Sequence, residues 1–227
     1  MALFVAAVTL AGAALLSVVP FQWQDEDLVL LGALAGLAVI SEALDFAPFA
    51  NSRISLSVAL ILVAGIVSGL PGVAVVVTVA VIADSLVHPK PLFKALFNEG
   101  ALLLAGAAYV AVFEAFSTGY SNKDWPDALA PALLGSALNF AVNSGLVACA
   151  IGIETKTNPL GVWNDRFRWL FPHYVIVGVL AVTMAAAYDR WELGGVALLV
   201  VPLAMVWFSL RQYVGMASAF RRRFQRA

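Results

Sequence analysis

The chain has 227 residues, of which 62% are hydrophobic and only 12% are charged, and its mean hydropathy is +0.92. Because a soluble domain carries roughly a quarter charged residues, this composition excludes an ordinary soluble globular protein. A formal net charge of -1 gives no indication of a nucleic-acid partner, and we expect none. The single cysteine, Cys149, excludes an internal disulfide and a cysteine-based metal cluster. The composition therefore indicates an integral membrane protein and leaves its activity open.

Continuous apolar runs follow one another along the chain, with only short polar breaks between them. A bilayer-spanning helix needs roughly 20 mostly apolar residues, whereas the strands of a membrane barrel alternate in hydropathy, which these runs do not. The sequence therefore predicts an all-α, polytopic helical membrane bundle with about eight spans. The runs cover residues 2–20, 28–44, 55–70, 72–87, 95–115, 128–150, 173–188 and 194–210.

Two of these predicted spans need separate comment. The first run has no basic residue before it, because no Lys or Arg precedes Arg53, so we interpret it as a retained helix rather than a signal peptide. The third and fourth runs meet at Leu70, Pro71 and Gly72, and each is about 16 residues long, or roughly 24 Å at the helical rise. We expect this pair to form either a tilted or a re-entrant hairpin.

The basic residues predict the orientation of the bundle. Of the thirteen Lys and Arg residues, only Lys123 and Arg190 fall on one set of alternate span ends. The other set holds Arg53, Lys90, Lys94, Lys156, Arg166, Arg168, Arg211, Arg221, Arg222, Arg223 and Arg226. Since cytoplasmic loops carry the excess of Lys and Arg, both termini should lie in the cytoplasm of a cell membrane protein.

The chain divides into a polytopic domain over residues 1–210 and a basic cytoplasmic tail over residues 211–227. This tail contains five arginines and no acidic residue. Each basic residue near an anionic bilayer contributes roughly 1 kcal/mol of attraction, so the tail is typical of a juxtamembrane lipid anchor. It also has the form of a segment that contacts a protein partner. The residues predicted to bind lipid or a partner are Arg211, Arg221, Arg222, Arg223 and Arg226.

Four carboxylates fall inside or at the ends of the apolar runs, where ionisable groups are costly and often functional. Glu42, Asp84 and Glu99 lie toward the predicted cytoplasmic face, and Glu114 lies at the outer end of the fifth span. Two interpretations stand side by side. Either these groups form interfacial ion pairs with nearby basic residues, or Glu42, Asp84 and Glu99 contribute to a proton, ion or ligand site.

Asparagines supply a second set of polar groups at membrane depth. Asn139 and Asn143 are four residues apart, so they share one face of the sixth span, with Ser136 close to it. Such amides either bridge helices or line a ligand cavity. Asn98 is treated in the same way, and it could instead cap a helix that restarts after Pro89 and Pro91.

Enzymatic signatures are absent from the sequence. There is no His-Glu-x-x-His pair, no Gly-x-Ser-x-Gly elbow and no phosphate-binding glycine loop. His88 and His173 lie far apart and have no third ligand near them in sequence, which makes a poor metal site. We therefore expect no enzyme, no cofactor and no metal centre.

Several local patterns resemble the multi-span N-terminal membrane domains of bacterial signalling proteins with HD-GYP or GGDEF output domains. They are Arg53-Ile54-Ser55-Leu56-Ser57, Ser68-Gly69-Leu70-Pro71-Gly72, Leu96-Phe97-Asn98, Leu138-Asn139-Phe140 with Asn143, and Arg211-Gln212-Tyr213. The resemblance covers residues from about 40 to 215, whereas a catalytic output domain would begin where this sequence stops. It implies a membrane sensory or assembly role without catalysis, with the output supplied by a partner protein.

The sequence thus leaves three functions in view. The first is a non-enzymatic sensory or scaffolding module that engages the lipid bilayer and a protein partner at its cytoplasmic face. The second is a small-molecule or ion transport component, because the short Gly- and Ala-rich spans with a broken hairpin are also similar to the vitamin-binding subunits of energy-coupling-factor transporters. The third is a structural subunit of a larger membrane complex. None of the three names a ligand.

Overall fold

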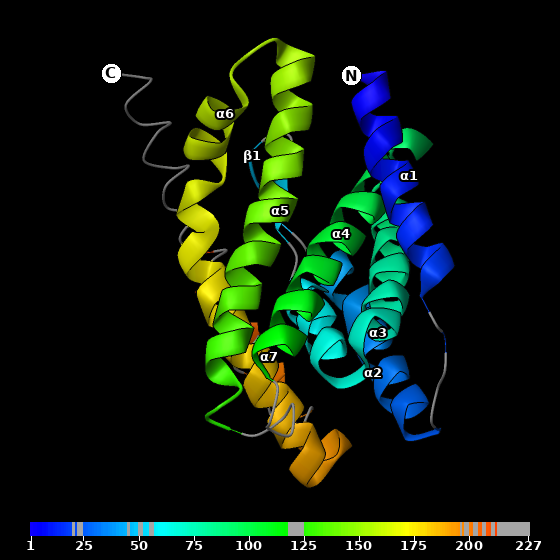
Figure 1. Cartoon of the computed structure of the whole chain (residues 1–227), viewed down its shortest axis with the longest axis vertical. Coiled ribbons are helices and arrows are strands. Elements are labelled where there is room, and N and C mark those ends of the chain that lie inside the picture. The colour runs from blue at the N-terminus through cyan, green and yellow to red at the C-terminus, as the bar shows by residue number, and fades with distance from the viewer. Residues whose placement is uncertain are drawn as a thin grey trace.

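The computed structural model describes residues 1–19, 21, 25–44, 46–49, 52–54, 57–117 and 125–195, with isolated positions between 197 and 212. It is a bundle of helices that run up and down the long axis of the molecule (Figure 1). The helices are α1 (Ala2–Val18), α2 (Asp25–Ala43), α3 (Ser57–Val87), α4 (Leu92–Phe116), α5 (Leu129–Thr155), α6 (Pro159–Arg166), the 3-10 turn η1 (Arg168–Leu170) and α7 (Phe171–Trp191). Eight of the seventeen residues of the predicted span 194–210 lie outside the described residues, as do the five arginines of the tail 211–227.

Four helices in the described part of the chain are long and apolar enough to cross a membrane: α3, α4, α5 and the η1–α7 unit. The apolar portions of α1 and α2, Ala2–Val18 and Leu28–Ala43, are shorter. The structure therefore confirms an all-α bundle with four candidate membrane-spanning helices among the described residues, and it places a helix on each predicted run from 2–20 to 173–188. It does not confirm eight spans, and the count remains a prediction.

Helix α3 reverses direction in its middle, as its contacts with α4 show. A Cβ placed on Gly65 would lie 3.1 Å from Val110, and one placed on Gly69 would lie 3.7 Å from Glu114. Residue numbers therefore increase in the same direction on both helices, which means that this part of α3 runs parallel to α4. Beyond the reversal, Val73 contacts Gly106 and Thr78 contacts Glu99. This part of α3 therefore runs antiparallel to α4. Residues 57–68 and 70–87 are therefore the first and second arms of a helical hairpin.

The reversal has a local cause in the sequence. Gly69 has φ 61° and ψ -150°, a conformation open to glycine and strained for every other residue. Pro71 follows two residues later, in the first turn of the second arm, where its missing N–H costs little. The predicted hairpin is thus present, with its turn at Gly69 rather than after Leu70.

The first arm forms the centre of the molecule. Every residue of this arm from Ala59 to Ile66 is buried, so the arm has no face directed to the outside. At about 12 residues it is roughly 18 Å long, shorter than the ~30 Å hydrocarbon core. Helices α2, α4 and α7 all contact α3. A helix that is apolar on all sides is stable only when other helices surround it, and these neighbours supply that environment.

Glycines let several of the helices approach closely. Helix α1 crosses α4 where a Cβ on Gly12 would lie 2.6 Å from the Gly100 Cα. Gly178 of α7 packs in the same way against Ser136 of α5. The sequence analysis did not name Gly12 or Gly100, although small residues at helix crossings are expected where packing alone holds helices together.

Two segments differ from the predicted loops. Residues Phe46–Phe49 and Ser52–Ile54 pair as the antiparallel strands β1 and β2, between α2 and α3. Helix α6 and η1 occupy what was predicted to be a loop around residues 154–172. Helix α6 begins because the Asn158 side chain accepts a hydrogen bond from the Leu160 N–H at 2.9 Å and Pro159 occupies the first helical position.

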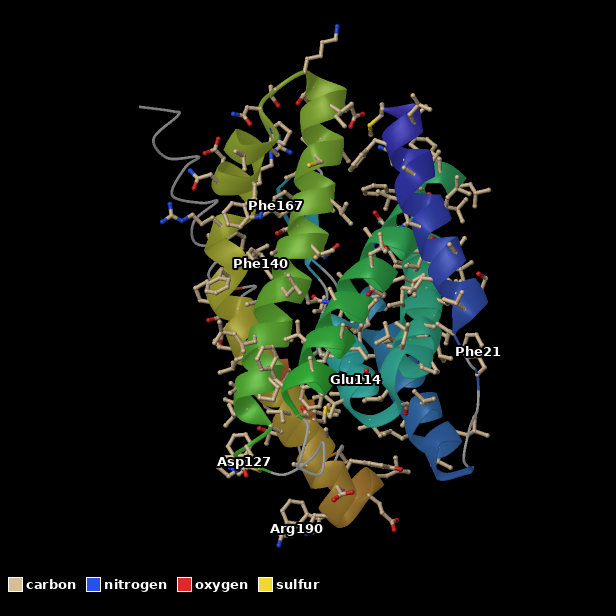
Figure 2. All side chains as sticks on the ribbon, viewed as in Figure 1. Phe21, Glu114, Asp127, Phe140, Phe167 and Arg190 are labelled. Atoms are coloured by element: carbon tan, nitrogen blue, oxygen red, sulfur yellow. The ribbon has the colours of Figure 1, made fainter. Side chains whose placement is uncertain are left out.

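Charge divides between the two ends of the bundle. The N-terminus, the α3–α4 junction and the α5–α6 loop lie at one end (Figure 1). The segments at this end carry Lys90, Lys94, Lys156, Arg166 and Arg168. Figure 2 shows Arg190 and Asp127 at the opposite end. We call the end with the N-terminus and the α5–α6 loop the basic end. Its Lys and Arg residues belong to the larger of the two sets predicted from the sequence.

Candidate functional site

A hydrogen bond joins α5 to α6, and aromatic contacts join α5 to α7. The Trp163 Nε1–H of α6 donates to the Ser144 Oγ at 2.8 Å, and the Ser144 hydroxyl in turn donates to the Phe140 carbonyl at 2.5 Å. Asn143 lies beside Tyr174 of α7. This α5–α6–α7 junction therefore contains one of the predicted site residues, Asn143. Asn139, one turn earlier on α5, is buried.

Aromatic rings surround these hydrogen bonds. The Phe140 ring lies 5.9 Å from Trp163, 5.7 Å from Phe171 and 4.8 Å from Tyr174, measured between centroids and with tilted planes. Phe167, which follows α6, is buried in the same cluster, and Figure 2 places it near Phe140. Tilted aromatic pairs at such separations add roughly 0.5–1.5 kcal/mol each beyond the area they bury. The junction is consequently a well-packed link and not a loose contact.

Only part of this junction could be predicted from the sequence. The spacing of Asn139 and Asn143 placed both on one face of α5, but it did not show that α6 lies against that helix. Trp163 has the character of an interfacial tryptophan in sequence, whereas its indole hydrogen-bonds into the bundle. Phe140 is almost completely buried, so its ring packs inside the protein, which no spacing in the sequence indicated.

A second group of predicted residues lies between α3 and α4. The Thr78 hydroxyl donates to the Glu99 carboxylate, with Oγ1 and Oε1 3.0 Å apart. Closer to the basic end, the Asp84 carboxylate pairs with Lys90, and the His88 Nδ1 lies 3.4 Å from it. Asp84 and Lys90 are mostly shielded from solvent, so this ion pair fixes the turn that leads from α3 into α4. No feature of the sequence singled out Thr78.

The remaining two predicted residues stand elsewhere. Glu42 is buried in the last turns of α2. Asn98 lies inside α4, which begins at Leu92, so the idea that it caps this helix is wrong. The helix restarts directly after the proline break, because Pro91 is the residue before the first turn of α4.

The predicted site residues therefore form separate groups rather than one site. Asn98 and Glu99 belong to α4, whereas Asn139 and Asn143 belong to α5, and no hydrogen bond between described residues joins the two pairs. Within the described ranges, no three His, Cys, Asp or Glu side chains gather closely enough to hold a metal ion. The arrangement supplies hydrogen bonds between helices and a link from the bundle to a surface helix.

Comparison of the chain with protein-family models, with curated proteins and with solved structures found no match.

Proposed function

We propose that this chain is a non-enzymatic membrane sensory module that couples its helical bundle to a protein partner at the basic end. The observation that carries the proposal is the hydrogen bond from Trp163 of α6 to Ser144 of α5. It joins a short helix at the end of the bundle directly to the polar face of a membrane-length helix. A sensor needs such a connection, because a change inside the bundle must reach a surface that a partner can contact.

Helix α6 has the properties of the responding element. None of its residues is buried, and Leu160 in its first turn is strongly exposed. On its inner side, Trp163 contacts Phe140 of α5, and the segment continues through η1 into α7. A shift of α5 relative to α7 must therefore alter the position of α6, since α6 is attached to both.

A partner in the cytoplasm requires that the basic end of the bundle lie on that side of the membrane. We place the basic end in the cytoplasm, because Lys and Arg gather there and cytoplasmic ends carry this excess. Single cysteines at Thr157 and at Asp127, in a Cys149→Ala background, test this assignment in intact cells. A membrane-impermeant thiol reagent should label position 127 only, and labelling of position 157 alone would reverse the orientation.

A transport component is the second candidate, and the α3 hairpin favours it. Transporters place their substrates and coupling ions beside interrupted helices, where a break in the backbone at membrane depth lies within protein. The first arm of α3 is such an element, buried at the centre of the bundle and broken at Gly69. In this case Asn143 and Glu99 are the residues to test for binding of a small molecule.

Photo-crosslinking distinguishes the two candidates. A photoreactive amino acid at position 160 should crosslink to a protein in native membranes, whereas one at position 191, exposed at the other end of α7, should not. The Trp163→Phe substitution should reduce the adduct at position 160, and Trp191→Phe is its matched control. Equal adducts at both positions, or an adduct unaffected by Trp163→Phe, would contradict the sensory proposal.

Native mass spectrometry of the gently solubilised protein supplies the other half of the test. The transport candidate predicts a retained small molecule that is lost in the Asn143→Leu variant while the protein still inserts. The sensory candidate predicts a stoichiometric protein partner that stays bound in the Asn143→Leu variant. A protein found free of both would count against each proposal.

A further inference from the structure

Two buried polar side chains of α4 and α5 have no hydrogen-bond partner. Tyr109 of α4 is completely buried, and its hydroxyl oxygen makes no hydrogen bond. Asn139 of α5 is 4% exposed, and no residue that the structure describes hydrogen-bonds to its amide. Nearly all buried polar groups in folded proteins are hydrogen-bonded, because a group left without a partner costs free energy. Each of the two side chains therefore requires a partner other than the described residues.

Contacts between α4 and α5 place the two side chains close together. A Cβ on Gly135 of α5 would lie 2.7 Å from the Tyr109 Cδ2 and 3.0 Å from its Cε2, so the ring packs directly on Gly135. Asn139 follows Gly135 by about one helical turn and lies on nearly the same face of α5. Ala101, which precedes Tyr109, clusters with Ala150 near the end of α5. The two helices are therefore antiparallel.

Antiparallel packing directs the two side chains toward each other. Side chains on an α-helix point back toward its N-terminus. On α4, this direction leads the Tyr109 hydroxyl from the level of Gly135 toward the level of Asn139. On α5, it leads the Asn139 amide back toward Gly135. The hydroxyl and the amide thus share one part of the helix interface, although no direct hydrogen bond joins them.

The surroundings of the two groups are uncharged and lie deep in the bundle. Figure 2 shows Phe140, the residue after Asn139, well away from both ends of the molecule. The neighbouring parts of α3, α4 and α5, residues 57–83, 100–113 and 129–153, contain no Asp, Glu, Lys, Arg or His. A charged ligand would have no counter-charge there, and burial of an unpaired charge is costly. The partner of the two groups is therefore neutral.

We propose that one water molecule bridges the Tyr109 hydroxyl and the Asn139 amide inside the bundle. Water is neutral, and it donates and accepts hydrogen bonds, as both of these groups do. A buried water bonds to two to four polar groups that otherwise have no partner, and this site supplies two. The close packing of the ring on Gly135 favours a molecule of this small size. The site lies inside the bundle, so the proposal is independent of the sensory role.

Thermal unfolding of the full chain in nanodiscs tests whether the two groups share a partner. Tyr109→Phe should lower the Tm by about 2–4 °C, because it removes a hydrogen bond. A hydroxyl that truly lacks a partner predicts the opposite sign, since its removal relieves a cost. The double variant Tyr109→Phe/Asn139→Leu should lose less than the sum of the two single shifts. In the matched control, Tyr109→Phe/Asn143→Leu, the shifts should add.

Radiolytic labelling tests whether the shared partner is water. A brief X-ray pulse converts water, including bound water, to hydroxyl radicals that oxidise the side chains beside it. In ¹⁸O-water, mass spectrometry should find ¹⁸O on Tyr109, which bulk radicals do not reach because the side chain is completely buried. Asn139→Leu should remove this label, and Asn143→Leu should retain it. An unlabelled Tyr109 in the wild type, or a higher Tm in Tyr109→Phe, would overturn the proposal.

Discussion

Thr78 on the second arm of α3 donates a hydrogen bond to Glu99 on α4, with the Oγ1 and Oε1 atoms 3.0 Å apart. The two helices run antiparallel here, so this bond ties the hairpin to the next long helix. A carboxyl group inside a membrane-length helix is costly to bury, and a hydroxyl partner offsets part of that cost. The pair therefore holds α3 and α4 in register at membrane depth.

A double-mutant cycle measures this pair. Thr78→Val and Glu99→Gln should each lower the free energy of unfolding, and the coupling between them should be about 0.6–1.7 kcal/mol, the range found for hydrogen bonds between membrane helices. Unfolding in mixed micelles gives the four values. Thr183→Val is the control, because its hydroxyl bonds only to the Val179 carbonyl of its own helix. A coupling of zero would show that the Thr78 hydroxyl does not stabilise Glu99.

Trp163→Phe should loosen α6 while keeping an aromatic ring beside Phe140. Loss of one hydrogen bond lowers the local opening free energy by about 1 kcal/mol, which makes backbone hydrogen exchange across residues 159–166 about fivefold faster. Ser144→Ala should act in the same direction. Trp191→Phe, at an exposed position, should leave this segment unchanged. Unaltered exchange in Trp163→Phe would mean that the aromatic contacts alone hold α6.

Gly100→Ala should weaken the attachment of α1. A Cβ at this position would lie 2.6 Å from the Val8 carbonyl oxygen, which is backbone and cannot move aside without displacing the helix. Overpacking of this kind costs about 1–3 kcal/mol, and limited proteolysis should cleave α1 sooner. Gly145→Ala is the control on α5, where a methyl group meets open space and should be neutral or slightly stabilising. Equal behaviour of the two variants would contradict the close crossing.

Gly69→Ala should destabilise the hairpin turn. Alanine cannot adopt φ 61° with ψ -150° without strain, and residues held in such regions cost about 1–3 kcal/mol. The expected result is a lower Tm with an unchanged helix content. Gly32→Ala, on an exposed position of α2 with nothing within 4 Å, should not lower the Tm. A neutral Gly69→Ala variant would show that the turn relaxes to another backbone conformation.

The positions of the helices along the chain were predictable because long apolar runs alternate with short polar breaks. The predicted runs 95–115 and 128–150 lie inside α4 and α5, whose ends extend a few residues into the polar breaks. The Ser68–Gly72 pattern also indicated the hairpin. Its orientation relative to α4 could not be read from the sequence, because that depends on which glycines meet which side chains.

Most contacts between helices could not be predicted from the sequence. Gly65, Gly106 and Gly178 lie where helices approach closely, whereas Gly32 and Gly36 face open space. Composition cannot distinguish a glycine at a crossing from one on an outer face. Strands β1 and β2 were missed because they are too short for an alternating pattern to stand out.

The first arm of α3 also sets an order on the biosynthesis of the protein. Of the helices that contact α3, α2 precedes it in the chain, whereas α4 and α7 follow it and do not yet exist when the ribosome releases the arm. About 12 residues are too few to anchor a segment across the bilayer by themselves. The arm therefore reaches its central position only once α7 has been synthesised, which makes the closing of the bundle around it a late step in assembly.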